Sequence, residues 1–353
     1  MTSRERVLAA LRRQVPDRVP ATLYDQVIGY VPAIAAMLHE KCTGQPPGEY
    51  FQCDVTSVDF RPTRLSPPAS NQIPTGPDVR VDEWGIGWRS GGYLHYQEML
   101  HPMQTLPAAG IRDYVFPDVD AEYRFAGVKA QVDQAHQCGF AVTAYPGSIF
   151  ECAWYLRGMT ELFFDIASDP PTADFLLDRI TERVLAATRQ FAAADIDILI
   201  LGDDIATQRG LLMSLPMWRR VLKPRLQQVI RAAKDVKPDV LIFYHSDGNV
   251  WDAIPDLIDA GVEVLNPVQP ECLDPARVKK AFGYHLAFFG TVSIQKTMPF
   301  GTPAQVQAEV KERIETVGRD GGLLIAPAHV LQPDTPWENI VAFFDAVQRY
   351  GWS

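Results

Sequence analysis

A histidine and an aspartate separated by one residue follow an apolar run at residues 240–243. Alternate side chains of an extended chain share a face, so His245 and Asp247 point the same way where the predicted strand ends. A second histidine, His329, follows another apolar run at residues 323–326. Two imidazoles and a carboxylate can hold a metal ion, move a proton, or only hydrogen-bond to each other. Metal binding by His245, Asp247 and His329 is the favoured interpretation.

Three further carboxylates are candidates for proton transfer. Asp203 and Asp204 are adjacent, so on an extended chain they face opposite ways, and we expect one of them to enter the site and the other to cap or to pair with Arg209. Asp204 is the one chosen as a catalytic candidate. Glu151 has apolar neighbours, and burial there would raise its pKa toward neutrality. Asp59 follows the second predicted strand. The predicted catalytic residues are therefore Asp204, Glu151 and Asp59.

Several polar side chains follow predicted strands within a few residues. Amide groups in such positions suit a neutral polar ligand better than a polyanion, although each alone is more often an ordinary loop residue. The predicted substrate-binding residues are Tyr145, Tyr155, Gln208, Asn266, Gln269, Gln295 and Gln332.

Eight short apolar runs alternate with helical segments and predict the framework for these residues. The runs lie at residues 19–23, 55–58, 140–144, 198–201, 240–244, 262–265, 286–289 and 323–326. Strands covered on both faces read as continuous apolar runs, and eight of them can close a barrel. Thr302-Pro303 and Thr335-Pro336 each predict a helix start with a capping residue followed by a first-turn proline. We therefore expect a (β/α)8 TIM barrel preceded by an N-terminal helix. A doubly wound sheet is the alternative, but no G-x-G-x-x-G follows the first run.

Residues 61–117 interrupt the alternation. This stretch is rich in proline and then alternates from Val79 to Gly85, a pattern typical of a β-hairpin. We expect an insertion after the second strand that lies over one end of the barrel as a lid. The whole chain, residues 1–353, is interpreted as one domain.

Composition excludes several classes of partner. The formal charge is −10, from 33 basic and 43 acidic residues, so the chain lacks the basic footprint of a nucleic-acid-binding protein. No apolar run reaches the roughly 20 residues of a membrane span, and the charged N-terminus does not fit a signal peptide. Five cysteines without C-x-x-C spacing argue against a disulfide framework and a zinc knuckle. These features predict a soluble cytoplasmic protein.

Four segments together resemble the uroporphyrinogen decarboxylase superfamily, which includes cobalamin-linked methyltransferases as well as the tetrapyrrole decarboxylase. They are Gly202–Gly210, His245–Gly248, Asn266–Pro270, and Pro327–His329 with its continuation through Thr335–Ile340. The resemblance covers nearly the whole chain and is strongest from Gly202 onward. It implies a (β/α)8 barrel with its site at the carboxyl ends of the strands.

The resemblance also bears on the branch of the superfamily. The decarboxylase holds its polyanionic substrate with arginines after the first strand, whereas residues 23–30 contain none, which makes uroporphyrinogen itself an unsuitable substrate. The methyltransferases carry zinc on a His-x-Cys pair and a distant cysteine. His245 matches that histidine, while Asp247 and His329 replace the two thiolates. Such a set makes the ion a harder Lewis acid that favours oxygen ligands, which disfavours methyl transfer to a thiol.

The leading hypothesis is a metal-dependent methyltransferase or demethylase of a small methylated substrate, with zinc as the expected ion. The methyl group would pass to a corrinoid on a partner protein, because this chain has no corrinoid-binding D-x-H-x-x-G segment. The alternative is a decarboxylase of a small aromatic or heteroaromatic acid, with Asp59 or His329 protonating the carbanion. A third hypothesis is a barrel that only binds and delivers a ligand. A homodimer is compatible with each.

Overall fold

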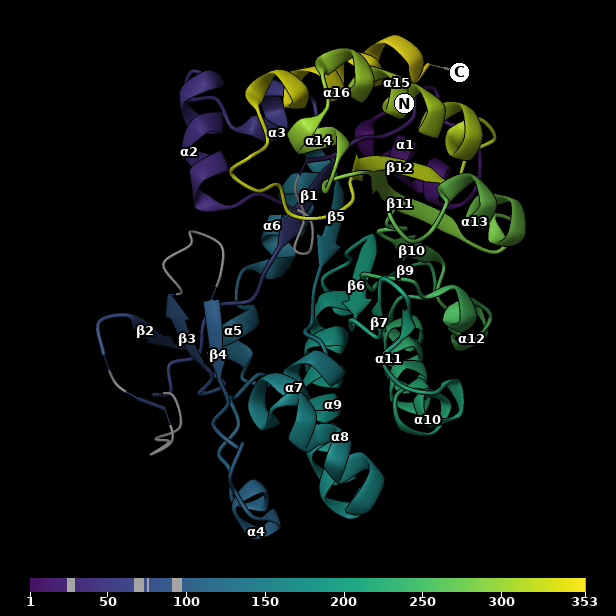
Figure 1. Cartoon of the computed structure of the whole chain (residues 1–353). Helices are drawn as coiled ribbons and strands as arrows, with labels where there is room; N and C mark the ends of the chain where they lie inside the picture. The colour runs from purple at the N-terminus through teal and green to yellow at the C-terminus, as the bar shows by residue number, and fades with distance from the viewer. Residues whose placement is uncertain (24–28, 67–72, 75, 91–96, 353) are drawn as a thin grey trace.

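The computed structural model describes residues 1–23, 29–66, 73–74, 76–90 and 97–352. Its main sheet is parallel, has the strand order β1-β5-β6-β9-β10-β11-β12, and curls round into a barrel (Figure 1). The strands are β1 (Val55–Val58), β5 (Ala141–Ala144), β6 (Ile198–Gly202), β9 (Leu241–His245), β10 (Val264–Asn266), β11 (Ala287–Val292) and β12 (Leu323–Pro327). Seven of the eight predicted strands are thereby confirmed, with ends that differ by at most three residues.

Alternation along each strand separates an inner from an outer core. In β9, Leu241 and Phe243 belong to a cluster built from alternate residues of all seven strands, whereas Ile242 and Tyr244 pack in the larger cluster shared with the helices. This period of two is what a curled parallel sheet with two buried faces requires. The inner cluster also contains Val7 and Leu11 of helix α1 (Ser3–Leu11). The predicted N-terminal helix therefore closes the amino end of the barrel.

The predicted first strand, residues 19–23, is not a regular strand. Only Ala21 forms a bridge, parallel to Ile325 of β12, with the Ile325 amide donating to Pro20 O at 2.9 Å. On the other side, the Asp54 amide donates to Ala21 O at 2.9 Å. A ladder cannot continue because Pro20 has no amide hydrogen and the Ala21 amide donates to the Asp54 carboxylate. The segment nevertheless joins β12 to the start of β1 and completes the ring.

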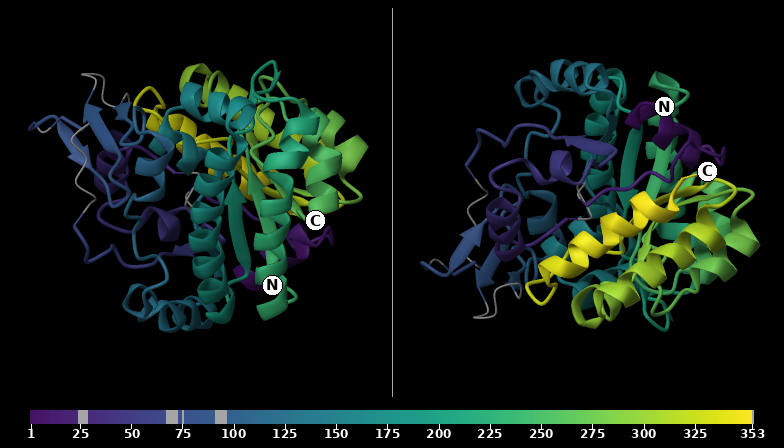
Figure 2. Two further views of the ribbon diagram at one scale, coloured as in Figure 1. Left: turned by 90° about the horizontal axis from the view of Figure 1, so that it is seen from below. Right: turned by 90° about the horizontal axis from the view of Figure 1, so that it is seen from above.

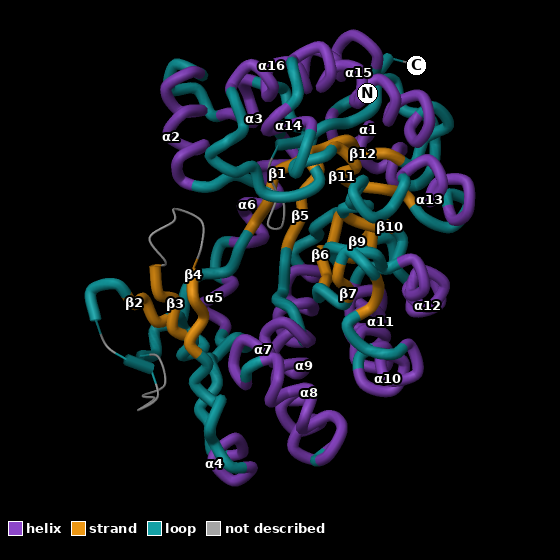
Figure 3. The backbone as a smooth tube through the Cα atoms, viewed as in Figure 1, coloured by secondary structure: helices purple, strands orange, loops and turns teal. Residues whose placement is uncertain are grey.

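Helices surround the sheet (Figures 2 and 3). They are α2 (Pro32–Lys41), α3 (Pro47–Tyr50), α4 (Ala108–Arg112), α5 (Glu122–Phe125), α6 (Val128–Gln137), α7 (Phe150–Arg157), α8 (Met159–Ser168), α9 (Pro170–Ala193), α10 (Leu215–Val221), α11 (Lys223–Val236), α12 (Ile254–Ala260), α13 (Pro275–Phe282), α14 (Thr297–Phe300), α15 (Pro303–Arg313) and α16 (Trp337–Tyr350), with the short helices η1 (Trp251–Ala253) and η2 (Ile314–Gly318). Among the described residues, no helix combines the length and apolar character needed to cross a bilayer.

Of the two predicted capping residues, Thr302 caps its helix and Thr335 does not. Thr302 caps α15 as expected, since its side chain accepts from the Gln305 amide and the Gln305 side chain returns to the cap. Thr335 does not cap α16, where the capping position is Pro336 and no side chain bonds to the first turn. Thr335 is buried and its amide donates to Gln332 O, so this threonine belongs to the preceding turn.

The insertion forms a three-stranded antiparallel sheet of β2 (Val79–Val81), β3 (Gly87–Ser90) and β4 (Gln97–Leu100). The predicted hairpin is confirmed as β2–β3, but β4 was not expected. This small sheet lies at the side of the barrel, next to α5 and near α7 (Figures 1 and 2). Residues 67–72, 75 and 91–96 of the predicted insertion, and residues 24–28 of the arginine-free loop, lie outside the described residues. A second, two-stranded hairpin of β7 (Ala206–Thr207) and β8 (Gly210–Leu211) follows β6.

Candidate metal centre

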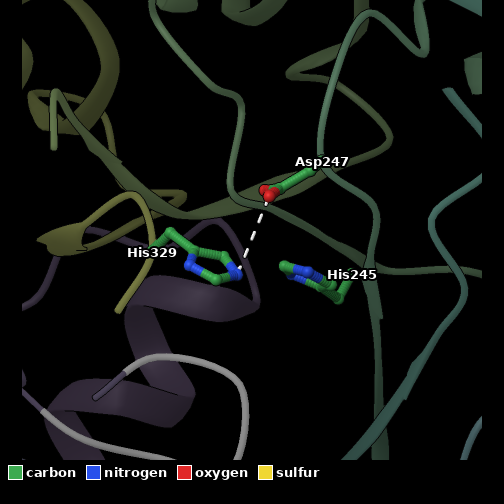
Figure 4. A group of neighbouring side chains, drawn as sticks. All are labelled: His245, Asp247 and His329. Carbon is green, nitrogen blue, oxygen red and sulfur yellow. Dashed lines mark ion pairs between the residues drawn. The ribbon is translucent and has the colours of Figure 1, made fainter. Parts of the chain in front are cut away.

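Three side chains converge at the carboxyl end of the barrel. His245, Asp247 and His329 each offer one ligand atom, and these atoms all lie within 4.8 Å of one another. His329 Nε2 is 3.7 Å from Asp247 Oδ2, and the two imidazole centroids are 5.8 Å apart (Figure 4). These atoms are too far apart to hydrogen-bond to each other. They face one another across a space, as the ligands of one ion do.

The orientation of His245 is set by a buried amide. Its Nδ1 lies 2.5 Å from Asn266 Oδ1, and Asn266 Nδ2 donates to Phe289 O at 2.8 Å. The Asn266 side-chain nitrogen must face Phe289 O, because only the nitrogen can donate. The Asn266 side-chain oxygen therefore faces His245, and Nδ1 of His245 carries the hydrogen. The lone pair of the neutral ring is then on Nε2, which lies 3.7 Å from Asp204 Oδ1. This is the arrangement by which an outer amide prepares a histidine for a metal.

Asp247 stands on a loop that is held from two sides. Its own amide donates to Asp204 Oδ1 at 2.6 Å, and the next amide, that of Gly248, donates to Gln269 Oε1 at 3.1 Å. Gly248 has φ +85°, and a Cβ at this position would lie 2.6 Å from Thr207 O. Only glycine fits both the conformation and the space. The loop is therefore closely positioned over β7.

The two histidines have opposite pKa shifts. Burial lowers the pKa of His245, but the nearby carboxylates of Asp247 and Asp204 outweigh burial and the net shift is upward. Burial also lowers the pKa of His329, and the charge of His245 adds to that effect, so the carboxylates of Asp247 and Asp204 do not compensate and the net shift is downward. A neutral imidazole is the form that binds a metal ion, so His329 is already in that form at neutral pH.

Glu151, on α7, lies beside this centre. Burial, followed by the charge of Asp204, raises the pKa of Glu151 to about 7. Tyr155 donates its hydroxyl hydrogen to Glu151 Oε1 at 2.8 Å, and the Asp204 amide also bonds to the Glu151 carboxylate. A carboxyl group with a pKa near 7 can both hold and release a proton at neutral pH. Its surroundings are those of an acid/base residue.

Asp203 and Asp204 take different directions, as their adjacency predicts. Asp203 is buried and accepts hydrogen bonds from the amides of Ile149, Phe150 and Glu151 at the start of α7. It thus positions the helix that carries Glu151. Asp204 instead faces His245 and the Asp247 loop.

The predicted substrate-binding residues are not all in one place. Asn266 and Gln269 are buried, and their described bonds hold His245 and the Asp247 loop. Gln208 and Gln295 are exposed and bond to each other at 3.3 Å across the loops after β6 and β11. The Gln332 amide nitrogen donates to Val330 O. Thus the structure brings Asn266 and Gln269 to the His/Asp/His cluster as supporting residues and leaves Gln208 and Gln295 at the surface.

The remaining candidates face a different space. Tyr145, Tyr155 and Asp59 line a cavity between the insertion and the barrel. Asp59 is exposed and bonds to the Phe60 amide at 2.8 Å. Of these three, the described contacts connect Tyr155 to the surroundings of the His/Asp/His cluster, through Glu151.

A curled parallel β/α barrel with a His/Asp/His cluster at the carboxyl ends of its strands defines the class of protein. The model of one family, Uroporphyrinogen decarboxylase (URO-D), matches residues 103–350, and the chain belongs to that family.

Curated relatives and one solved structure resemble the chain over nearly its full length. It is 22% identical to the uroporphyrinogen decarboxylase of Anaeromyxobacter dehalogenans, covering 98% of this chain and 99% of that protein. It is 24% identical to the uroporphyrinogen decarboxylase of Methylococcus capsulatus, covering 97% of each. A solved structure, described as a methyltransferase from Methanosarcina mazei, matches with a TM-score of 0.69 and 20% identity over 99% of each chain. At that identity, the structural match supports the fold.

Proposed function

We propose that the protein is a metal-dependent methyltransferase or demethylase that acts on a small methylated substrate. The observation that carries this proposal is that potential ligand atoms of His245, Asp247 and His329 lie within 4.8 Å of one another, while Asn266 occupies Nδ1 of His245 and leaves Nε2 as the nitrogen available to an ion. Two imidazoles and a carboxylate form a donor set that zinc and similar divalent ions bind. When bound, such an ion would supply Lewis acidity toward a substrate oxygen.

The residues around the cluster have two further roles, positioning the ligand atoms and donating a proton. Asn266 and Gln269 hold His245 and the Asp247 loop in place, so the ligand atoms are positioned before an ion arrives. Glu151, with its pKa near 7, is protonated in about half of the molecules at neutral pH and can donate its proton to a leaving oxygen.

The reaction that fits these roles is cleavage of a methyl–oxygen bond. The oxygen keeps the bonding electron pair and takes the proton of Glu151, while the methyl group passes to a reduced corrinoid on a partner protein. Oxygen is the expected leaving atom because a His/His/Asp set favours oxygen ligands, whereas a thiolate-rich set would activate sulfur.

A decarboxylase of a small aromatic or heteroaromatic acid is the second candidate. The raised pKa of Glu151 favours it as well, because a protonated carboxyl at neutral pH can protonate a carbanion. Release of carbon dioxide from a candidate acid, without any methyl product, would select this reaction over methyl transfer.

Metal content tests the proposal directly. Elemental analysis of the purified protein, supplied with zinc and then dialysed, should find one ion per chain. Asp247→Ala and His329→Ala should lose it, while Asp235→Ala and His285→Ala, at exposed positions outside the cluster, should retain it. Folded wild-type protein that never takes up a divalent ion would overturn the proposal.

A further inference from the structure

A cavity of about 420 Å³ lies between the insertion and the barrel. Its walls come from the β2–β3 turn and β3, the loops after β1 and β5, and helices α7 and α9. The volume lies within the range of small-molecule sites, which occupy roughly 300–1,000 Å³. The cavity is separate from the His/Asp/His cluster, since none of those three residues lines it.

Aromatic side chains dominate the cavity walls. The rings that line it are Phe60, Trp84, Trp88, Tyr145 and Tyr155, and each is only partly buried. Trp88 and Tyr155 meet edge to face, with ring centroids 5.9 Å apart and planes at 76°. An aromatic ring interacts most favourably with another ring that stacks on its free face or meets its edge. Five partly buried rings around one space therefore favour a flat aromatic occupant.

Hydrogen bonds within the protein hold the indole of Trp88 and the backbone of Trp84. Asp82 accepts from Trp88 Nε1 at 2.8 Å and from the amides of Trp84 and Ile86 at 2.9 and 3.0 Å. Tyr114 donates its hydroxyl hydrogen to Trp84 O at 2.7 Å. A wall fixed in this way loses little conformational entropy when a ligand binds, so its contacts contribute more fully to affinity.

The two arginines in the wall differ in their partners. The Arg124 guanidinium is buried and pairs with Glu83 at 2.8 Å. Arg183, on α9, is half-buried; its Nε and Nη1 donate to the carbonyls of Pro117 and Arg179, and its guanidinium stacks on Phe116. Among the described residues, no acidic side chain forms an ion pair with Arg183. Glu182 and Asp120 act on this guanidinium by charge alone, and its described hydrogen bonds go to carbonyl groups. A half-buried cation in this situation favours an anionic ligand group.

We infer that this cavity binds the ring of an aromatic carboxylate, with the carboxylate directed to Arg183. This inference rests on the proposed function in one respect, that the occupant is the substrate. Tyr155 supplies the connection, because its ring lines the cavity while its hydroxyl bonds to Glu151, which in turn bonds to the Asp204 amide beside His245. The ring would thus bind on the insertion side of α7, and a substituent of the ring would reach Glu151.

Isothermal titration calorimetry with three probes of similar size tests the inference. The probes are 4-methoxybenzoate, its neutral counterpart 4-methoxybenzyl alcohol, and the non-planar cyclohexanecarboxylate. We expect saturable binding of 4-methoxybenzoate, with about tenfold weaker binding of each of the other two, because each lacks either the charge-assisted hydrogen bonds or the ring contacts. Equal affinity for 4-methoxybenzoate and cyclohexanecarboxylate would overturn the aromatic assignment, and equal affinity for the benzoate and the alcohol would overturn the carboxylate assignment. Failure of 4-methoxybenzoate to bind would overturn both.

Variants locate the binding to this cavity. Arg183→Met should weaken binding of 4-methoxybenzoate about tenfold and leave the alcohol unchanged, since only the benzoate loses a charge-assisted hydrogen bond. Arg189→Met, at an exposed position on the same helix, should behave as wild type. Trp88→Leu should weaken the benzoate and the alcohol alike, whereas Trp352→Leu, 59% exposed near the C-terminus, should not. If Trp88→Leu fails to fold, the Arg183 pair still decides the question; wild-type affinity in Arg183→Met would overturn the inference.

Repeating the titration after treatment with EDTA separates this inference from the proposed function. Retained binding of 4-methoxybenzoate by a protein that never takes up metal would sustain the aromatic cavity while overturning the metal-dependent reaction. A protein that binds zinc at the cluster but does not bind 4-methoxybenzoate would support the metal site and overturn the aromatic cavity.

Discussion

The Nδ1 atom of His245 and the amide oxygen of Asn266 lie 2.5 Å apart, and the register of the sheet places these two residues side by side on β9 and β10. The Asn266 amide nitrogen is occupied by Phe289 O, so the amide cannot turn over without losing both bonds. A bond between neighbouring strands of a rigid barrel thus determines which nitrogen of His245 is free. The strand pairing therefore fixes the orientation and the tautomer of His245, the candidate ligand.

Removal of this amide should weaken metal binding. In Asn266→Ala, neither the orientation of the His245 ring nor the nitrogen that carries its hydrogen would be fixed. Loss of such an outer hydrogen-bond partner lowers metal affinity about 10–100-fold. The measurement is competition for zinc against a chromophoric chelator. Asn249→Ala is the matched control, because the Asn249 side chain bonds to the Trp251 amide and does not contact His245. Unchanged zinc affinity in Asn266→Ala would show that the amide does not position a ligand.

A methyl group on Gly202 should displace His245. Gly202 pairs with His245 across β6 and β9, and a Cβ there would lie 2.7 Å from His245 O and 2.8 Å from His245 Cβ. Overpacking of this kind costs about 1–3 kcal/mol. We expect Gly202→Ala to lower the free energy of unfolding in urea by that amount and to weaken zinc binding. Gly48→Ala, where the nearest described atom is 4.0 Å away, should be close to neutral.

The buried carboxylate of Asp54 should be essential for stability. Asp54 is fully buried and pairs with Arg6 at 2.7 Å and with Arg18 at 3.0 Å, which joins α1 and the segment before β1. Removing one partner of a buried ion pair leaves an uncompensated charge and costs about 3–5 kcal/mol. Asp54→Ala should therefore show a large drop in the free energy of unfolding. Asp239→Ala, which removes an exposed partner of Arg12, should change that free energy by less than about 1 kcal/mol.

Glu151 should make stability depend on pH. Its pKa is near 7 in the folded protein and near its ordinary value of 4.5 in the unfolded chain, so the folded state holds the proton more tightly. The stabilisation is complete below about pH 4.5 and is lost as pH rises through 7. Glu151→Gln, which stays neutral, should thus gain stability relative to wild type as pH rises from 5 to 8, by up to about 3 kcal/mol.

This comparison belongs in EDTA, because a bound cation would stabilise the charged carboxylate. Urea unfolding at several pH values measures the difference, and Glu338→Gln at an exposed position should show no such trend. A difference between wild type and Glu151→Gln that stays constant with pH would contradict the raised pKa.

Apolar runs predicted most of the barrel because buried parallel strands have a distinctive composition. The exception at residues 19–23 shows the limit of that reasoning. Its apolar residues are buried as a strand's would be, but Pro20 and the Asp54 carboxylate remove the donors that a ladder needs. The proline was visible in the sequence, whereas the carboxylate comes from a residue more than 30 positions away.

The cluster was more predictable than its surroundings. Strand ends placed His245 and His329 correctly, because all parallel strands deliver their carboxyl ends to one face of the barrel. The contacts of Asn266 and Gln269 depend on which strands are neighbours and on side-chain direction, which spacing alone does not reveal. The same holds for Arg183, since helical spacing alone does not predict that Arg183 lines the cavity beside the insertion.

Helix α1 has a consequence for the direction from which a partner can approach. Val7 and Leu11 pack in the inner core at the amino end of the cylinder, whereas the cluster lies at the carboxyl ends of the strands. Under the proposed function, a partner protein would therefore dock at the carboxyl rim to receive a methyl group. A substrate held in the cavity between the insertion and the barrel would leave that rim to the partner, so both could be bound at once.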